Sequence, residues 1–311
     1  MTLTQLSAFV LVARLGSVRA AAEALGVSEP AVSQAIAALR KQLGDELVFR
    51  SAGGMALTPG GQRLVGIASQ IVSLGAEAEA AVRAANGAPE QLRVVADGVV
   101  AEYMMPGLLE AFERRYGAVA ATVGVVSTAQ MPELVRERLA DVGVSFSVPP
   151  PGTPALDSVA VMRCEVVAVA SPSMAHAQRK SWLVGPCYGD ERSPLRRALE
   201  RSGGKSGEIS VFPSQAAAIA AAGRGEGVAP VIDRVVTKEL SVGSLVLYDA
   251  SGLPQRTYLS SMTLPAPMCS AVAASFRRFL STPQAMQLMS RPQDSQPPGR
   301  FRPPVFVTLW N

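Results

Sequence analysis

Residues that could carry covalent or metal chemistry are few and scattered in this chain of 311 residues. The three cysteines, Cys164, Cys187 and Cys269, are widely spaced, and the single histidine, His176, has no second histidine at helical spacing. Metal sites and nucleophilic catalysis both need such partners. We therefore expect no catalytic residue, no metal ion and no cofactor, and we interpret Cys164, in an apolar segment, as a core residue.

A second group of side chains is suited to hydrogen bonding with DNA. Ser33 and Gln34 carry a hydroxyl and an amide that can pair with base edges in the major groove, and the Glu29 carboxylate can accept from cytosine. Arg50 is expected on a phosphate. The full predicted DNA-binding set is Ser28, Glu29, Pro30, Ser33, Gln34, Lys41 and Arg50.

Two short helices around a turn at Gly26 must position this group. Val32, Ile36, Leu39 and Leu43 recur at steps of three and four, so they predict one buried stripe of the second helix. Ser28 is a plausible N-cap, and Pro30 is tolerated in the first turn. Segments 47–50 and 56–58 then read as two short strands around a turn at 51–55. The pattern predicts a winged helix-turn-helix, although ordinary alanine-rich helices remain an alternative.

A long helix is predicted next, capped by Thr58 and opened by Pro59. Apolar residues at heptad spacing form a seam along it that is typical of paired helices. The seam consists of Leu64, Ile71, Ala78 and Ala85 at one position, and of Ile67, Leu74 and Ala81 at the other. A helix packed against its own domain is the alternative. The segment from Asn86 to Pro89 ends the helix.

About 200 residues follow, enough for two lobes. Strands are predicted at 92–96, 119–126, 142–146, 164–170, 245–248 and 258–262, and helices at 105–116, 131–139, 214–222 and 271–280. Because strands and helices alternate, a mostly parallel sheet is expected. The glycines between Gly223 and Gly227 follow a helix and precede an apolar segment, so we interpret them as a turn and not as a nucleotide-binding loop.

The order of these features resembles the LysR-type transcriptional regulators from about residue 3 to about residue 285. The resemblance is carried by Ala21-Ala22, Val27-Ser28, Pro30-Ala31-Val32-Ser33, Phe49-Arg50 and Leu57-Thr58 at their spacings. It implies an α/β fold with a mainly helical winged helix-turn-helix head (1–58), a linker helix for dimerisation (59–88) and a two-lobed α/β effector domain (89–289). Lobe I would cover about 89–160 and 265–289, and lobe II about 161–264. The effector domain would share the architecture of type 2 periplasmic binding proteins, and residues 290–311 read as a disordered tail.

The same resemblance implies an effector site where strands end and helices begin. Its residues would be Asp97, Gly98, Val99, Ser127, Thr128, Ser145, Phe146, Ser214 and Gln215. Asp97 departs from the serine or threonine usual in the family. Two interpretations are open: Asp97 pairs with an effector that bears an amine or guanidinium, or it caps the following turn or faces solvent.

The function expected from these features is sequence-specific DNA binding by a transcriptional regulator that responds to a small-molecule effector. Expected partners are promoter DNA, the effector, a second copy of the chain in a dimer or tetramer, and RNA polymerase. The chain carries a formal charge of only +4, so pattern and not charge supports DNA binding. Without a signal peptide or a membrane-spanning run, we expect a cytoplasmic, nucleoid-associated protein. One alternative is a DNA-organising protein with no effector response, and another is a solute-binding or catalytic protein with an accessory head.

Overall fold

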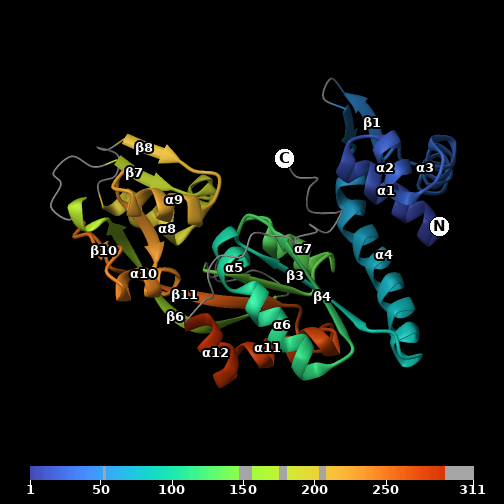
Figure 1. Cartoon of the computed structure of the whole chain (residues 1–311). Helices are drawn as coiled ribbons and strands as arrows, with labels where there is room; N and C mark the ends of the chain where they lie inside the picture. Colours follow the sequence, from blue (N-terminus) through green and yellow to red (C-terminus); the bar gives the residue numbers. More distant parts are fainter. Residues whose placement is uncertain (52–53, 147–155, 175–180, 203–207, 291–311) are drawn as a thin grey trace. The chain divides into compact units, whose positions relative to one another are not determined.

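The computed structural model describes residues 1–51, 54–146, 156–174, 181–202 and 208–290. They form two compact units (Figure 1). The first contains residues 1–90 together with 136–140, and the second contains residues 91–135 and the described residues from 141 to 290. None of the described helices is long and apolar enough to span a bilayer. His176 and the predicted tail beyond residue 290 lie outside the described residues.

Three helices open the first unit: α1 (Leu3–Leu15), α2 (Val18–Leu25) and α3 (Glu29–Leu43). Each ends at a glycine with positive φ, namely Gly16, Gly26 and Gly44, a conformation that favours glycine because it has no Cβ. The Ser28 side chain accepts a hydrogen bond from the Ala31 backbone N–H at 3.4 Å. The predicted cap and turn of the helix-turn-helix are therefore confirmed.

The predicted buried stripe of α3 is correct for three of its four residues. Val32, Ile36 and Leu39 are buried against α1 and α2. Leu43 is 46% exposed, so its assignment to the core was wrong. Leu43 is the last residue of α3 and lies beyond the residues of the small core that this helix covers.

Strands β1 (Val48–Ser51) and β2 (Gly54–Leu57) pair antiparallel and form the wing. Helix α4 (Pro59–Ala85) follows, and the Thr58 side chain caps it by accepting from the Gly61 N–H at 2.9 Å. Leu64 and Ile71 of the predicted seam pack against the core of the head. Ile67 and Leu74 are 57% and 48% exposed. One edge of the seam, with Leu64 and Ile71, therefore packs on its own unit. The other edge, with Ile67 and Leu74, is exposed to solvent, and we call it the open edge of α4.

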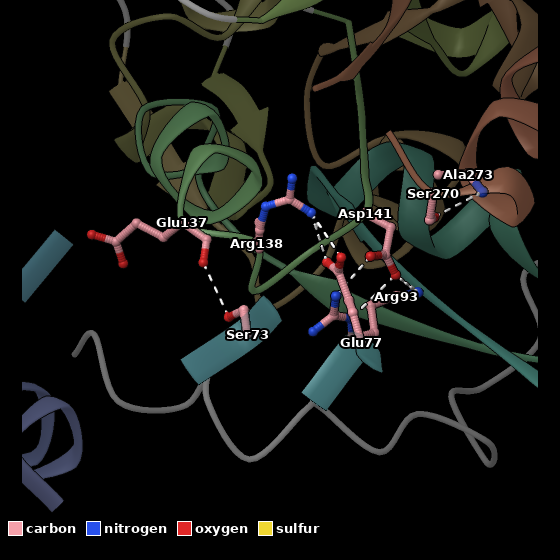
Figure 2. A network of polar contacts seen from close by, with 8 residues as sticks. All are labelled: Ser73, Glu77, Arg93, Glu137, Arg138, Asp141, Ser270 and Ala273. Atoms are coloured by element: carbon pink, nitrogen blue, oxygen red, sulfur yellow. Dashed lines mark hydrogen bonds and ion pairs between the residues drawn. The ribbon is translucent and has the colours of Figure 1, made fainter. Parts of the chain in front are cut away.

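Residues 136–140 complete the first unit through polar contacts. Arg14 of α1 donates to Glu137 Oε2 at 2.6 Å and to the Ser69 hydroxyl of α4 at 2.8 Å. Figure 2 shows the Ser73 hydroxyl directed at the Glu137 carbonyl oxygen and the Arg138 guanidinium directed at the Glu77 carboxylate, at 2.8 Å. Ion pairs and hydrogen bonds therefore stabilise the buried side of α4 in addition to apolar packing.

The second unit alternates helices and strands along the chain. Its first half contains β3 (Glu90–Ala96), α5 (Gly98–Tyr103), α6 (Met105–Tyr116), β4 (Val119–Val125), α7 (Met131–Arg136), β5 (Val142–Ser145), β6 (Asp157–Ala170) and η1 (Pro172–Met174). Its second half contains β7 (Ser181–Val184), η2 (Pro186–Gly189), α8 (Pro194–Arg201), β8 (Glu208–Val211), α9 (Gln215–Gly223), β9 (Ala229–Ile232), η4 (Asp233–Val236), α10 (Thr237–Ser241), β10 (Val246–Leu247), β11 (Gln255–Thr263), α11 (Ala271–Leu280) and α12 (Pro283–Ser290).

Among the described residues, the main sheet has the strand order β10-β6-β11-β5-β3-β4, and β9 also pairs with β6. Strands β3 and β5 are parallel, whereas β5 with β11 and β6 with β9, β10 and β11 are antiparallel. The prediction of a mostly parallel sheet was therefore wrong at its centre. The long strands β6 and β11 pair antiparallel from Gln255↔Val166 to Thr263↔Asp157. This strand pair connects the two halves of the unit.

Among the described residues, two apolar cores stabilise this unit. The rings of Phe112, Phe276 and Phe279 contact one another in the larger core, with centroids 5.0 to 6.2 Å apart. Trp182 of β7 lies in a smaller core with residues of β6 and α8, and β7 pairs in parallel with β8. Helix α7 ends at Arg136, earlier than the predicted Leu139, because Arg138 adopts a positive φ of 59° that an α-helix cannot contain.

Candidate DNA-binding surface and effector site

The predicted DNA-binding residues all lie on the surface of the head. Ser28, Glu29, Pro30, Ser33, Gln34 and Lys41 are exposed on α3 or at its N-cap, on the side away from the buried stripe. Arg50 is exposed on β1 of the wing. The N-terminal residues of a recognition helix are those that contact base edges in helix-turn-helix proteins. The fold therefore presents the predicted group as one solvent-accessible set with a wing beside it.

Arg40 holds α3 and the wing together. Its Nε donates to the Glu46 carbonyl oxygen at 2.7 Å, its guanidinium also donates to the Val48 carbonyl, and it forms an ion pair with Glu46 at 3.1 Å. Because Val48 begins β1, these bonds set where the wing starts relative to the helix. The sequence gives no local signal for this role, since the carbonyl partners are recognisable only in the folded chain.

Asp97 is a buried cap at the start of α5. Its Oδ1 accepts from the Val100 N–H at 3.0 Å, and its Oδ2 accepts from the Phe146 N–H, just after β5, at 2.9 Å. Burial raises the pKa of the Asp97 carboxyl to about 6, opposed by these backbone hydrogen bonds and assisted by the nearby Asp190 charge. Asp97 therefore caps the turn and does not face solvent, and each of its oxygens has a further lone pair with which a ligand N–H could bond.

Thr128 connects the end of β4 to the second half of the unit. Its N–H and hydroxyl both donate to Asp190 Oδ2, at 2.7 and 2.6 Å. Ser127 instead donates its hydroxyl to Gln130 Oε1 at 2.9 Å. Asp190 follows the 3-10 helix η2 and was not predicted as part of the site. It is far from Thr128 in the sequence, and only the folded chain brings the two residues together.

Phe146 and Ser145 are buried at the end of β5. The Phe146 carbonyl accepts from the Thr257 hydroxyl of β11 at 2.9 Å, while its N–H is bonded to Asp97. Gly98 and Val99 begin α5, and a Cβ on Gly98 would lie 3.5 Å from the Cys187 sulfur. Burial raises the pKa of the Cys187 thiol to about 12, so the thiol stays protonated at neutral pH.

Ser214 and Gln215 form the start of α9. Ser214 caps the helix by accepting from the Ala217 N–H at 3.1 Å, and Gln215 is buried and donates to the Pro230 carbonyl at 3.0 Å. Glu102 of α5 was not predicted as part of the site. Burial raises the pKa of its carboxyl, and the nearby backbone N–H groups of Ala216 and Gln215 partly oppose this rise. Helix α5 therefore connects the Asp97 region to α9.

The remaining site features concern a turn and metals. The chain between Gly223 and Ala229 leaves α9 and enters β9, with Gly225 at a φ of 84°, so the predicted structural turn is confirmed. In the part of the chain that the structure describes, no cluster of three His, Cys, Asp or Glu side chains has metal-binding geometry.

A winged helix-turn-helix head, a long helix and a two-lobed α/β domain together define a DNA-binding regulator with a ligand-binding domain. Residues 3–62 match the "Bacterial regulatory helix-turn-helix protein, lysR family", and residues 85–282 match the "LysR substrate binding domain". The chain belongs to the LysR family of transcriptional regulators.

Relatives and solved structures agree with this assignment. The chain is 32% identical to an uncharacterized HTH-type transcriptional regulator of Mycobacterium tuberculosis (strain CDC 1551 / Oshkosh), over 100% of both chains. Its fold is similar to ArgP from Mycobacterium tuberculosis (TM-score 0.65, 23% identity, 89% of this chain and 96% of that one). It is also similar to the full-length LTTR LysG from Corynebacterium glutamicum with bound effector Arg (TM-score 0.62, 21% identity, 92% and 99%). The alternative of a DNA-organising protein without effector response is not favoured, because the substrate-binding domain is present.

Proposed function

We propose that this regulator reads its operator with the exposed face of α3 formed by Ser28, Glu29, Pro30, Ser33, Gln34 and Lys41, and that Arg50 of the wing contacts phosphate. The observation that carries the proposal is the division of α3 into two faces. Val32, Ile36 and Leu39 are buried, while every predicted contact residue is exposed. Short polar side chains at the start of such a helix allow its backbone to approach the bases closely.

We further propose that the chain acts as a dimer, or as a tetramer built from dimers, through the open edge of α4. Ile67, Leu74 and Val82 are large apolar side chains that are 57%, 48% and 64% exposed along one helix. Pairing these helices would remove that surface from water and join two heads, so that they contact two half-sites at once. The domain boundaries 1–58, 59–88 and 89–289 belong to the same proposal.

The effector would bind between the lobes, among Asp97, Gly98, Val99, Ser127, Thr128, Ser145, Phe146, Ser214 and Gln215. Binding there changes operator affinity, and DNA changes effector affinity by the same factor. The chain acts as a regulator and not as an enzyme, at the nucleoid in the cytoplasm, with RNA polymerase as a further partner when it activates transcription.

The test compares two glutamine substitutions on the same helix. Gln34→Ala removes an amide from the proposed reading face, whereas Gln42→Ala removes the same group from the exposed C-terminal end of α3. At fixed salt, Gln34→Ala should weaken operator binding by about fivefold to a hundredfold or more, because losing a base contact costs about 1–3 kcal/mol. Gln42→Ala should change operator binding little. Equal affinities of wild type and Gln34→Ala for the operator would refute the proposed face.

A further inference from the structure

Two acidic side chains occupy backbone and hydroxyl donors of the proposed effector site, and a third, Glu102, lies near the start of α9. Asp97 accepts from the N–H groups of Val100 and Phe146. Asp190 accepts from both donors of Thr128. Glu102 lies near the N–H groups at the start of α9, which oppose the rise in its pKa that burial causes. The donors of Val100, Phe146 and Thr128, at which an anionic ligand would bind, are therefore already bonded to carboxylates of the chain itself.

Among the described residues, these carboxylates have no cationic partner. Within the described ranges, no ion pair joins Asp97, Glu102 or Asp190 to an arginine or lysine. Asp97 is buried and Glu102 and Asp190 are half-buried, so water screens their charges only partly. Burial is the main cause of the raised Asp97 pKa, and the negative charge of Asp190 adds a small contribution in the same direction. A positive group between them would relieve this repulsion.

Gln215 supplies an independent sign that a donor is missing. Its side chain is 3% exposed, its Nε2 donates to the Pro230 carbonyl, and its Oε1 is buried with no hydrogen-bond partner. This oxygen lies against Gly185, where a Cβ would be 2.8 Å away, and Gly185 is two residues before Cys187, which borders α5. A buried acceptor without a donor is costly, and an N–H group would satisfy it.

We propose that the effector presents a cationic N–H group, an ammonium or guanidinium, to Asp97, Glu102, Asp190 and the Gln215 Oε1 atom, and that these acids exclude effectors with a carboxylate at this position. The proposal rests on the proposed effector site. Positive charge offsets the acidic side chains, and the N–H hydrogens supply the missing donor for Gln215. A ligand carboxylate would be repelled by three negative charges. It would also have to replace Asp97 and Asp190 as acceptors of their hydrogen bonds.

The test uses the full-length protein and two probes of similar size and opposite charge, butylguanidinium and pentanoate, titrated by calorimetry. Butylguanidinium should bind saturably and at least about tenfold more tightly than pentanoate, a difference of about 1.4 kcal/mol. Glu102→Gln keeps the shape of the side chain and removes its charge, so it should lower butylguanidinium affinity severalfold. Glu110→Gln, on an exposed ion pair of α6, is the matched control and should bind like wild type.

Operator binding by the same ligand-free samples separates this inference from the proposed function. Asp190→Asn is a second variant in case Glu102→Gln does not fold, and it should lower butylguanidinium affinity in the same way. A wild type that prefers pentanoate, binds neither probe, or loses nothing in the folded acid-to-amide variants overturns the charge selectivity while operator binding persists. Loss of operator binding in wild type would instead refute the proposed function.

Discussion

Replacing Arg14 by methionine removes one partner of an almost buried ion pair inside the first unit. Arg14 and Glu137 lie 2.6 Å apart with side chains only 3% and 11% exposed, and Arg14 also donates to the Ser69 hydroxyl. Methionine retains most of the apolar volume of the arginine stem. The substitution therefore tests the charge and the hydrogen bonds more than the packing.

The expected cost follows from the burial of the pair. Breaking a buried pair by removing one charge typically costs about 3–5 kcal/mol, because the other charge stays in a poorly solvated place. An exposed pair is worth far less, about 0–1 kcal/mol. Replacing both partners, in Arg14→Met with Glu137→Met, should bring stability back toward the wild type, since neither charge is then left behind.

The measurement is hydrogen exchange of the full-length protein, resolved on peptides from α1, which gives the free energy of opening of that helix. Arg14→Met should lower this free energy by about 3 kcal/mol or more. The control is Arg83→Met, which removes the Arg83–Glu79 pair of α4, with side chains 61% and 75% exposed. If Arg14→Met protected α1 as well as Arg83→Met does, or if the double variant were less stable than either single one, the reasoning would be refuted.

Two further predictions concern assembly and pH. Ile67→Asp places a charge on the open edge of α4 and should convert the proposed dimer to a monomer, as measured by light scattering. Gln62→Asp, in the exposed first turn of the same helix, is the control and should leave the mass unchanged. An unchanged mass for Ile67→Asp would count against the proposed interface. The Asp97 carboxyl has a folded pKa of about 6, above its unfolded value near 4, so the stability that it contributes is complete below pH 4 and is lost as the pH rises through 6. Between these limits the wild type should lose about 3 kcal/mol relative to Asp97→Asn in denaturant titrations, and parallel pH profiles would contradict the assignment.

Features encoded by neighbouring residues could be predicted from the sequence. The start of α3 depends on Ser28 and its bond to the Ala31 N–H, and its end depends on a glycine that reaches positive φ. Both signals act within one helical turn. The limits of the method appear at Leu43, which keeps the apolar spacing but lies beyond the core that the other three residues contact.

Features set by distant pairing could not be predicted in the same way. Strand β6 extends back to Asp157 because β11 pairs with its first part, from Asp157 to Val166, whereas the local sequence shows only the apolar part from Cys164. Within the site, Asp97 and Thr128 were found because they follow strands. Asp190 and Glu102 were missed, because a 3-10 turn and a short helix bring them to the site only through packing.

The return of residues 136–140 to the first unit affects how this regulator can be dissected. A fragment cut after residue 90 would retain Arg14, Ser73 and Glu77 but would lose the segment that carries Glu137 and Arg138. Such an isolated head would expose charged and hydroxyl groups that the intact protein covers. Operator affinities measured on this fragment would describe a less stable head than that of the intact protein. Attaching the five-residue segment 136–140 through a short linker would be needed to recover the native structure of the head.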